Sequence, residues 1–367
     1  MRHLALTIAT LTATAITAPA FGQNLEYGSY LPPGHISNHY GLSPLFAKVA
    51  EETNGETKIN LQAGGALAGA KDTLSSIENG MIDGGFIVSV YVPDDIPLNN
   101  SLSDLVTSFT DPVASMGAIN ETMLIDCPEC VQEYENKNVV ALGAYSTTPY
   151  KLLCREPITN LSQVAGKKIR SAGDVWGRWI DAMGAVPVNV PNSEAYEAMQ
   201  RGQIDCVYGS VGWLKTLSLW DVAKNVLDQN MGSFAGGSFI SFNADSWEGM
   251  DEAARESLLT NIPDAMAAVA FAYKAEDERA LAEGAEKGVV VHAADPAISD
   301  LLKKHTETEI ALVTADAERR GATNVQTAHA ALLENIEKWT KIAEEVGDDQ
   351  EAFAEALRRE IYSKIKP

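Results

Sequence analysis

The 367-residue sequence is poor in basic residues and lacks a long apolar segment after residue 22. It contains 28 Lys and Arg against 50 Asp and Glu, which gives a formal net charge of −22. A charge this negative argues against nucleic acid and anionic membrane surfaces as partners. No later apolar run approaches the roughly 20 residues that a membrane-spanning helix needs, so we expect the mature chain to be soluble.

The first 22 residues have the pattern of a secretory signal peptide. Arg2 and His3 precede a stretch of small and apolar residues, and cleavage is expected after Ala20 or Gly22. Removal of residues 1–22 takes away Arg2 and leaves 27 basic against 50 acidic residues, a net charge of −23. We therefore predict a periplasmic protein. Its roughly 345 residues exceed what one hydrophobic core usually holds, so two domains are expected.

Motifs for the common enzyme chemistries are also missing. The sequence has no G-x-S-x-G turn, no zinc-binding motif and no phosphate-binding loop. Its six histidines are scattered, and their spacing does not suit a metal site. We therefore predict no cofactor, no metal and no enzymatic activity. A periplasmic enzyme stays an alternative, because scattered histidines still permit acid–base chemistry.

Only four cysteines are present, and in an exported chain they indicate disulfides with three possible connectivities. Cys154 and Cys206 each lie at or near a predicted strand, and we favour a bridge between them. Cys127 and Cys130 form a Cys-Pro-Glu-Cys motif in a polar loop, for which we favour a local bridge. A redox-active Cys-x-x-Cys is the functional alternative, although no thioredoxin-like strand and helix surround it.

Residues 150–220 alternate short apolar runs with amphipathic segments. Strands are predicted at 150–154, 167–169, 186–190 and 204–208, and helices at 175–183 and 194–201. This alternation predicts a parallel sheet, and such sheets bind ligands at the carboxyl ends of their strands. Arg170 lies at such an end, followed by Ser171 and Gly173. A guanidinium there can hold a carboxylate through two hydrogen bonds, although a surface arginine in a polar loop is the alternative.

A similar unit lies nearer the N-terminus. Strands predicted at 25–30 and 58–61 flank a helix at 38–53, so the loop between Tyr30 and His35 is expected to line a cleft. His35 is a candidate contact, or it caps the following helix. A strand at 84–90 would place Ser89 and Tyr91 at its carboxyl end as further candidates. Gly-x-x-Asp recurs at 80–83 and 202–205, which suits two halves built on one plan.

The run GKKIRSAG at 166–173 and the run GAVPVNVPNSEAYEAMQRGQID at 184–205 together resemble a known family pattern. The pattern is G-x-K-h-R, then G-A-x-P-x, then E-x-Y-x-A-h-x-x-G-x-h-D, where h is apolar. It belongs to the substrate-binding proteins of tripartite ATP-independent periplasmic (TRAP) transporters, the DctP-type family. Weaker similarities at 66–83 and 247–291 extend the resemblance over most of the mature chain.

The resemblance implies an α/β fold of two domains, with a ligand cleft between them, hinge strands and a long domain-spanning helix. It places the signal peptide at 1–22, a first domain at 23–145 and a second domain at 146–230. Residues 231–290 return to the first domain and form the long helix, and residues 291–367 form C-terminal helices. It further implies a monomeric protein that captures a small organic acid and delivers it to a permease of one small and one large integral subunit. A binding protein that feeds a sensor system is the alternative.

The chain departs from the family pattern at two site positions. An Asn commonly follows the last strand of the second domain, but Gly209 stands there. A second family Arg is absent, and its place falls near Pro149 and Tyr150. These departures favour a ligand with one carboxylate over a dicarboxylate or a sialic acid. They also favour an aromatic wall, for which the candidates are Trp176, Tyr208 and Trp213.

The remaining tryptophans of this region, Trp179 and Trp220, are expected in the core instead. The complete set of predicted ligand contacts is Arg170, Trp213, Trp176, Tyr208, Gly209, Asn192, Ser89, Tyr91 and His35.

Overall fold

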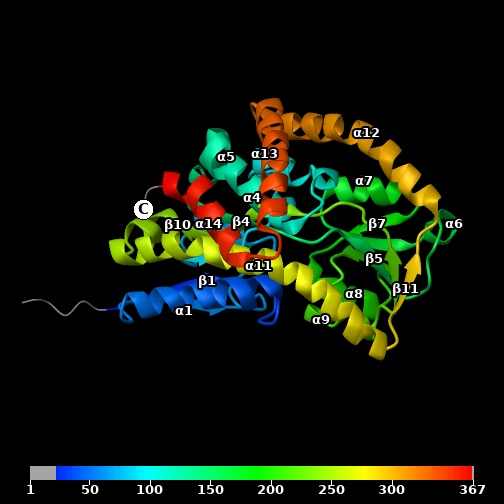
Figure 1. Cartoon of the computed structure of the whole chain (residues 1–367), viewed down its shortest axis with the longest axis horizontal. Coiled ribbons are helices and arrows are strands. Elements are labelled where there is room, and N and C mark those ends of the chain that lie inside the picture. Colours follow the sequence, from blue (N-terminus) through cyan, green and yellow to red (C-terminus); the bar gives the residue numbers. More distant parts are fainter. Residues whose placement is uncertain (1–21, 366–367) are drawn as a thin grey trace, which may run out of the picture.

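Two separate β-sheets carry the fold in the computed structural model, which describes residues 22–365. Helices pack on each sheet, and each sheet with its helices forms one lobe of the molecule (Figure 1). The predicted α/β class with two lobes is confirmed. The predicted signal peptide lies outside the described residues apart from Gly22.

The first lobe is built on a five-stranded sheet of order β2-β1-β3-β10-β4. Strand β1 is parallel to β2 and β3, whereas β10 runs antiparallel to β3 and β4. Its strands are β1 (Gln23–Gly28), β2 (Thr57–Gln62), β3 (Gly84–Gly85), β4 (Val139–Ser146) and β10 (Ala235–Asn243). Its first helices are α1 (Ser43–Glu52), α2 (Thr73–Glu78), α3 (Pro97–Ser103), α4 (Pro112–Glu121), α5 (Pro128–Glu135) and α10 (Ala244–Glu248).

The second lobe is built on a six-stranded sheet of order β11-β9-β5-β8-β6-β7. Its strands are β5 (Lys151–Cys154), β6 (Lys168–Ser171), β7 (Val186–Asn189), β8 (Cys206–Gly209), β9 (Asn225–Asp228) and β11 (Val290–Ala293). Its helices are α6 (Leu161–Val164), α7 (Asp174–Ala182), α8 (Ala195–Gln200) and α9 (Trp213–Thr216). Helix α7 is amphipathic and buries Val175, Trp176, Trp179 and Ile180.

Three expectations about the strands were wrong in part. Strands β6, β7 and β8 are parallel as predicted, but β5 is antiparallel to β8 and β9, because it enters from the other lobe without a crossover helix. Residues 226–243 were expected as strands that return to the first domain, but β9 pairs with β5 and β11 in the second sheet, and only β10 lies in the first. The strand predicted at 84–90 ends at Gly85, and Ser89–Tyr91 form a 3-10 turn.

Two extended segments and two helices connect the lobes. Residues 147–150 lead from β4 to β5, residues 229–234 lead from β9 to β10, and the two segments hydrogen bond to each other, for example from Tyr150 N to Gly232 O (2.8 Å). Helix α11 (Glu252–Glu286) contacts α1, α4 and α14 in the first lobe and α9 in the second. Figure 1 shows this helix running along both lobes and α12 arching back over the top.

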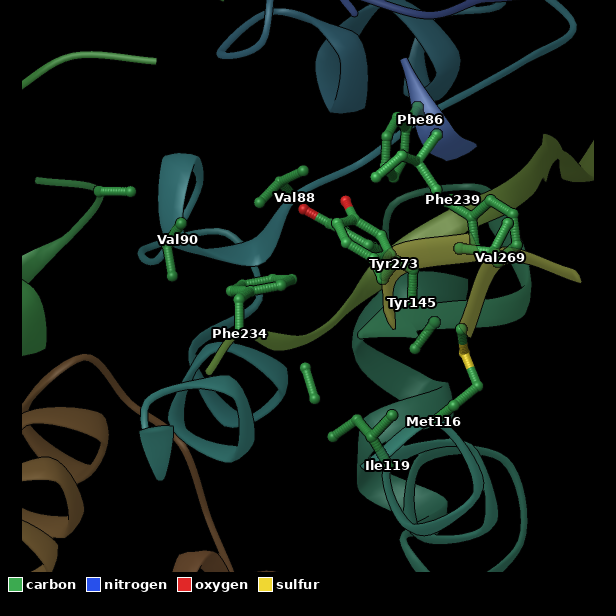
Figure 2. Packing of buried hydrophobic residues seen from close by; sticks show 14 of the residues in the cluster. Phe86, Val88, Val90, Met116, Ile119, Tyr145, Phe234, Phe239, Val269 and Tyr273 are labelled. Carbon is green, nitrogen blue, oxygen red and sulfur yellow. The ribbon is translucent and has the colours of Figure 1, made fainter. Parts of the chain in front are cut away.

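The C-terminal helices α12 (Pro296–Arg319), α13 (Val325–Val346) and α14 (Gln350–Glu360) close the structure. Helix α13 packs on α4 at Gly117, where an added Cβ would lie 2.1 Å from the ring of Trp339. Figure 2 shows the core of the first lobe, where Met116 of α4 and Val269 of α11 lie near Phe239 of the sheet. Across residues 22–365, no helix is long and apolar enough to cross a membrane.

Both favoured disulfides are present. Cys154 and Cys206 face each other across the antiparallel pair β5 and β8, with their Cα atoms 4.1 Å apart. Cys127 and Cys130 are joined at the start of α5, where their Cα atoms lie 5.2 Å apart. One bridge links two strands, and the other lies at the start of a helix. Both pairs are buried, so neither is exposed to a redox partner.

Candidate ligand-binding site

Arg170 is buried at the carboxyl end of β6, with 1% of its surface exposed. Its Nε donates to the Val190 carbonyl at 2.9 Å, and one terminal nitrogen donates to the Tyr208 carbonyl at 3.3 Å. Its other terminal nitrogen donates to the Tyr91 hydroxyl at 3.0 Å. Strands β7 and β8 therefore hold the guanidinium in one orientation, and Tyr91 of the first lobe holds it from the other side.

The charge of Arg170 is not balanced by an acid of this chain. Among the described residues, no carboxylate lies within 4.0 Å of its guanidinium. A guanidinium has five N–H donors, and three of those of Arg170 are in use, so two remain. Buried charges in proteins are normally paired, because desolvation of an unpaired charge is costly. The arrangement can therefore accept an anion.

Trp213 forms an aromatic face beside Arg170. The guanidinium carbon lies 5.5 Å from the centre of the Trp213 ring, a cation–π distance. The ring fills the space that a side chain at position 209 would need, because a Cβ added to Gly209 would lie 2.2 Å from it. Tyr150 packs against the same ring at 5.2 Å between centroids. The two departures from the family pattern thus place two aromatic rings beside Arg170.

Tyr91 and Asn192 join the lobes next to Arg170. The Tyr91 hydroxyl accepts a second hydrogen bond, from the backbone N–H of Asn192 at 3.2 Å. The side-chain oxygen of Asn192 is buried and has no partner among residues 22–365. Gly173, which has a φ of 81°, lies against Val90 of the first lobe, where an added Cβ would be only 3.2 Å away. The lobes are therefore in contact around Arg170.

Hollows on both sides mark the cleft between the lobes. One measures about 520 Å³ and includes Tyr30 and Gly64 of the first lobe and Ser193 and Tyr196 of the second. A second, of about 180 Å³, includes Tyr91 of the first lobe and Asn189 of the second. Tyr30 of the first hollow and Tyr91 of the second contact each other, with their ring centroids 6.0 Å apart.

Several tyrosines surround this buried group. Burial raises the pKa of Tyr30 well above its usual value, and Tyr91, Tyr273 and Tyr150 raise it further, whereas Arg170 lowers it. Burial likewise raises the pKa of Tyr150, again opposed by Arg170. These mutual effects place the phenol groups near one another and near the guanidinium. Tyr30 and Tyr150 therefore stay protonated at neutral pH, and their hydroxyls can donate a hydrogen bond.

The structure separates the predicted contacts into two groups. Arg170, Trp213, Gly209, Tyr91 and Asn192 lie together, as described above. Tyr208 contributes its carbonyl to Arg170, while its ring packs on Trp176 at 4.9 Å and its hydroxyl donates to the Met231 carbonyl. Trp176 is buried and stacks on Tyr150 at 5.0 Å. Its ring is therefore one layer removed from Arg170.

Ser89 and His35 occupy other positions. Ser89 is not at a strand end, because the chain leaves the sheet after Gly85, and its hydroxyl lies 2.7 Å from that of Ser103. His35 is buried, and its Nδ1 accepts the N–H of Ser37 at the start of the next helical turn, at 3.3 Å. It therefore acts as the cap that was the alternative, while its ring also lies 6.4 Å from that of Tyr273.

Of the two tryptophans expected in the core, Trp179 is buried there, whereas Trp220 is only partly buried. Trp179 is buried and donates to the Met231 sulfur at 3.2 Å, and Trp220 lies under Lys287 at 4.6 Å. Tyr150 and Tyr273 also lie near Arg170 and Trp213, but neither was predicted from the sequence. Tyr150 lies in the segment 147–150, which connects the lobes. The only sequence feature that pointed to it as a site residue was the absence of the second family Arg. Tyr273 lies inside the 35-residue helix α11, where an aromatic residue is indistinguishable from a core position.

The described residues contain no group of three or more His, Cys, Asp or Glu side chains that could hold a metal ion. The site chemistry is therefore that of one buried cation, aromatic faces and neutral hydrogen-bonding groups.

Comparisons with known proteins agree on one family. A family profile described as bacterial extracellular solute-binding protein, family 7 (DctP), matches residues 27–315. The protein TsaT of Comamonas testosteroni, described as an outer membrane transporter protein, is 24% identical over 302 residues, which cover 81% of this chain and 87% of the relative.

Solved structures show the same fold. A TRAP solute-binding protein from a marine metagenome, described as specific for aromatic acid ligands and crystallised with 3-hydroxybenzoate, matches with a TM-score of 0.77 at 19% identity. The match covers 87% of this chain and 99% of that one. A TRAP solute-binding protein from Rhodoferax ferrireducens, with copurified benzoate, also matches with a TM-score of 0.77, at 16% identity, over 88% of this chain and 99% of that one.

Proposed function

This chain belongs to family 7 of the bacterial extracellular solute-binding proteins, the DctP family, and on that premise we propose that it binds a small acid with one carboxylate and a flat ring. Arg170 would hold the carboxylate, and Trp213 would face the ring. The observation that supports this proposal most strongly is the buried guanidinium of Arg170. It has two free N–H donors, and no acidic residue of the described chain lies beside it. A carboxylate can accept both donors at once.

The preference for a ring rests on Gly209 and Trp213. The place in which the family carries an amide is filled by the Trp213 ring, which offers an apolar face instead of hydrogen-bonding groups. Tyr150 extends this face where the second family Arg would lie. Ring acids are also the ligands named for several proteins of this fold, among them benzoate, 3-hydroxybenzoate and mandelate. These observations support a ring acid over a flexible dicarboxylate.

The lobes would close on the ligand through the contacts around Tyr91 and Gly173. We propose the lobe boundaries predicted from the sequence, 23–145 and 146–230, with the crossing segments as the hinge. A ligand that contacts both lobes favours the closed form, since it binds that form better than an open one. The closed form would then be recognised by a permease of one small and one large integral subunit.

We also propose that the protein acts as a monomer in the periplasm after removal of its first 20 or 22 residues. The relatives are receptors of TRAP transporters, and the site offers binding groups without a nucleophile–base pair. Binding without turnover is therefore the activity proposed.

A thermal-shift panel of matched acids and amides tests the proposal. A ligand that binds only the folded state at 100 times its Kd stabilises it by about 2.7 kcal/mol, which raises the melting temperature by several degrees. Benzoate, phenylacetate, mandelate and pyroglutamate would be compared with their neutral amides and with succinate. The expected result is a shift with at least one ring acid and none with its amide. Equal shifts for acid and amide, or a shift with succinate alone, would contradict the proposal.

A further inference from the structure

A second set of buried polar groups lies beside the Trp213 ring, and hydrogen bonding within the chain leaves it unsatisfied. It consists of His35 Nε2, Ser37 Oγ, Trp213 Nε1 and the Tyr273 hydroxyl, here called the neutral polar cluster. All four atoms are buried, and among residues 22–365 none has a hydrogen-bond partner outside the cluster. Such groups are rare in folded proteins because an unpaired buried donor or acceptor is costly. Four of them near one another need a common explanation.

The four groups belong together in space. The rings of His35 and Tyr273 lie 6.4 Å apart, and Ser37 follows His35 by two residues. Burial raises the pKa of Tyr273 well above its usual value, and side-chain hydrogen bonding with Ser37 and Trp213 lowers it in part. Three segments therefore converge here, namely the segment after β1, the first residue of α9 and the middle of α11. Figure 2 shows the oxygen ends of Tyr145 and Tyr273 beside each other and directed toward Val88.

The cluster is rich in donors and carries no charge. His35 Nδ1 accepts the N–H of Ser37, so Nε2 is the nitrogen that carries the proton. Burial lowers the pKa of His35 to about 3, which keeps the ring neutral at physiological pH. The indole of Trp213 can only donate, and the hydroxyls of Ser37 and Tyr273 can donate or accept. The partner that satisfies this set is an oxygen atom with free lone pairs.

The cluster shares Trp213 with the Arg170 site. One side of this residue lies over the guanidinium at 5.5 Å, while its Nε1 belongs to the cluster near Tyr273. Tyr30 is influenced electrostatically by both Tyr273 and Arg170, which also places them around one space. A molecule bound to Arg170 along the Trp213 ring would therefore reach the cluster with its other end.

A negative charge of the protein lies beside the cluster. Asp277 is one turn after Tyr273 on α11, and its Oδ1 accepts from Gly212 N at 2.6 Å and from Ser210 Oγ at 3.0 Å. Its charge acts on Tyr273 by raising the pKa of that phenol. A second carboxylate of a ligand would be repelled by Asp277 and would find no cation in the cluster. An uncharged oxygen meets neither obstacle.

We propose that the ligand carries an uncharged hydroxyl or carbonyl oxygen at the end away from its carboxylate, and that His35, Ser37, Trp213 and Tyr273 bind this oxygen. The inference rests on the proposed function, because it takes the carboxylate to lie at Arg170. It narrows the ligand class to hydroxy or oxo ring acids and excludes ring dicarboxylates.

Calorimetric titration of matched acid pairs tests this inference. The pairs are benzoate with 3-hydroxybenzoate, phenylacetate with 3-hydroxyphenylacetate, and cyclohexanecarboxylate with its 3-oxo derivative; isophthalate serves as the dicarboxylate. At least one oxygen-bearing acid should bind about tenfold more tightly than its parent, the size expected of one or two neutral hydrogen bonds. Isophthalate should bind more weakly than 3-hydroxybenzoate.

The variant Tyr273→Phe separates recognition from stability. It should remove most of the affinity advantage that the oxygen-bearing acid has over its parent acid. Tyr134→Phe is the matched control, because the Tyr134 hydroxyl is also buried without a partner among the described residues but lies on α5, away from the site. It should change neither affinity.

The outcomes distinguish this inference from the proposed function. If parent and oxygen-bearing acids bind equally, if isophthalate binds best, or if Tyr273→Phe weakens both members of a pair alike, the inference is wrong while the carboxylate site stands. If Arg170→Gln leaves every affinity unchanged, or if no acid of the panel binds, the proposed function itself is wrong and the inference falls with it.

Discussion

Replacing Gly209 with Ala should displace the Trp213 ring and weaken ligand binding. An added Cβ would lie 2.2 and 2.3 Å from two ring carbons of Trp213, whereas ordinary contacts begin near 3.4 Å. The ring would have to retreat by more than an ångström. It is 2% exposed and packs on Tyr150 at 5.2 Å and on the Arg170 guanidinium at 5.5 Å, so its retreat would disturb both contacts.

The size of the effect follows from these contacts. Overpacking in a closed core costs about 1–3 kcal/mol. Disturbing the contact with Tyr150 adds about 0.5–1.5 kcal/mol, the usual contribution of an aromatic pair. We therefore expect the free energy of unfolding to fall by about 2–4 kcal/mol. The affinity for a ring acid should fall by about tenfold to a hundredfold, because the ring face and the guanidinium both lose their positions.

Urea unfolding and calorimetric titration measure the two effects. Gly177→Ala is the matched control, because it is a helical glycine of the same lobe whose added Cβ would meet Pro187 at an ordinary 3.7 Å. It should be neutral or slightly stabilising. Adding Trp213→Leu to Gly209→Ala should recover stability but not affinity. A Gly209→Ala protein with unchanged stability and affinity would refute the assignment of Trp213 to the wall of the site.

Three further results are expected. Burial raises the pKa of Asp104 to about 7 from an unfolded value near 3.8, so its contribution to stability declines as pH rises from about 4 to 7. Asp104→Asn should therefore remove roughly 2–3 kcal/mol of the stability change between pH 5 and 8, and equal pH profiles of the two proteins in urea unfolding would contradict this. Gly117→Ala should lower the free energy of unfolding by about 1–3 kcal/mol, because the added Cβ would overlap the Trp339 ring. An unchanged midpoint of urea unfolding would argue against the packing of α13 on α4. Tyr91→Phe should weaken ligand affinity about tenfold with little change in melting temperature, because it removes the hydroxyl that binds Arg170 from the first lobe. An unchanged affinity in calorimetric titration would show that Tyr91 does not contribute to the site.

The elements with a strong local pattern could be predicted from the sequence. The parallel strands β6, β7 and β8 follow from apolar runs separated by short amphipathic helices. The 35-residue helix α11 was expected from the family resemblance, and it forms although Pro263 lies inside it. The direction of β5 could not be predicted, because it depends on how the chain enters from the first lobe and not on the residues of the strand.

The site was predictable where one residue type carries the chemistry. Arg170 could be found because an arginine at a strand end has few structural roles, and the absence of a side chain at Gly209 pointed to a neighbouring aromatic residue. Whether Trp176 or Trp213 faces Arg170 could not be decided, since both are apolar residues near strand ends. Tyr273 could not be found, because it is separated from Arg170 by about a hundred residues and lies on α11, the long helix that contacts both lobes.

The measurement that tests the central claim most directly is a calorimetric titration of Arg170→Gln with the best ring acid. The account predicts a loss of affinity of at least a hundredfold, because breaking a buried charge pair costs about 3–5 kcal/mol. Without ligand, the variant should melt within a few degrees of the parent, since it removes a buried charge that no acid of the described chain balances. Arg201→Gln, which changes an exposed arginine paired with Glu197 in the same lobe, should bind normally. Retained affinity in Arg170→Gln would contradict the account.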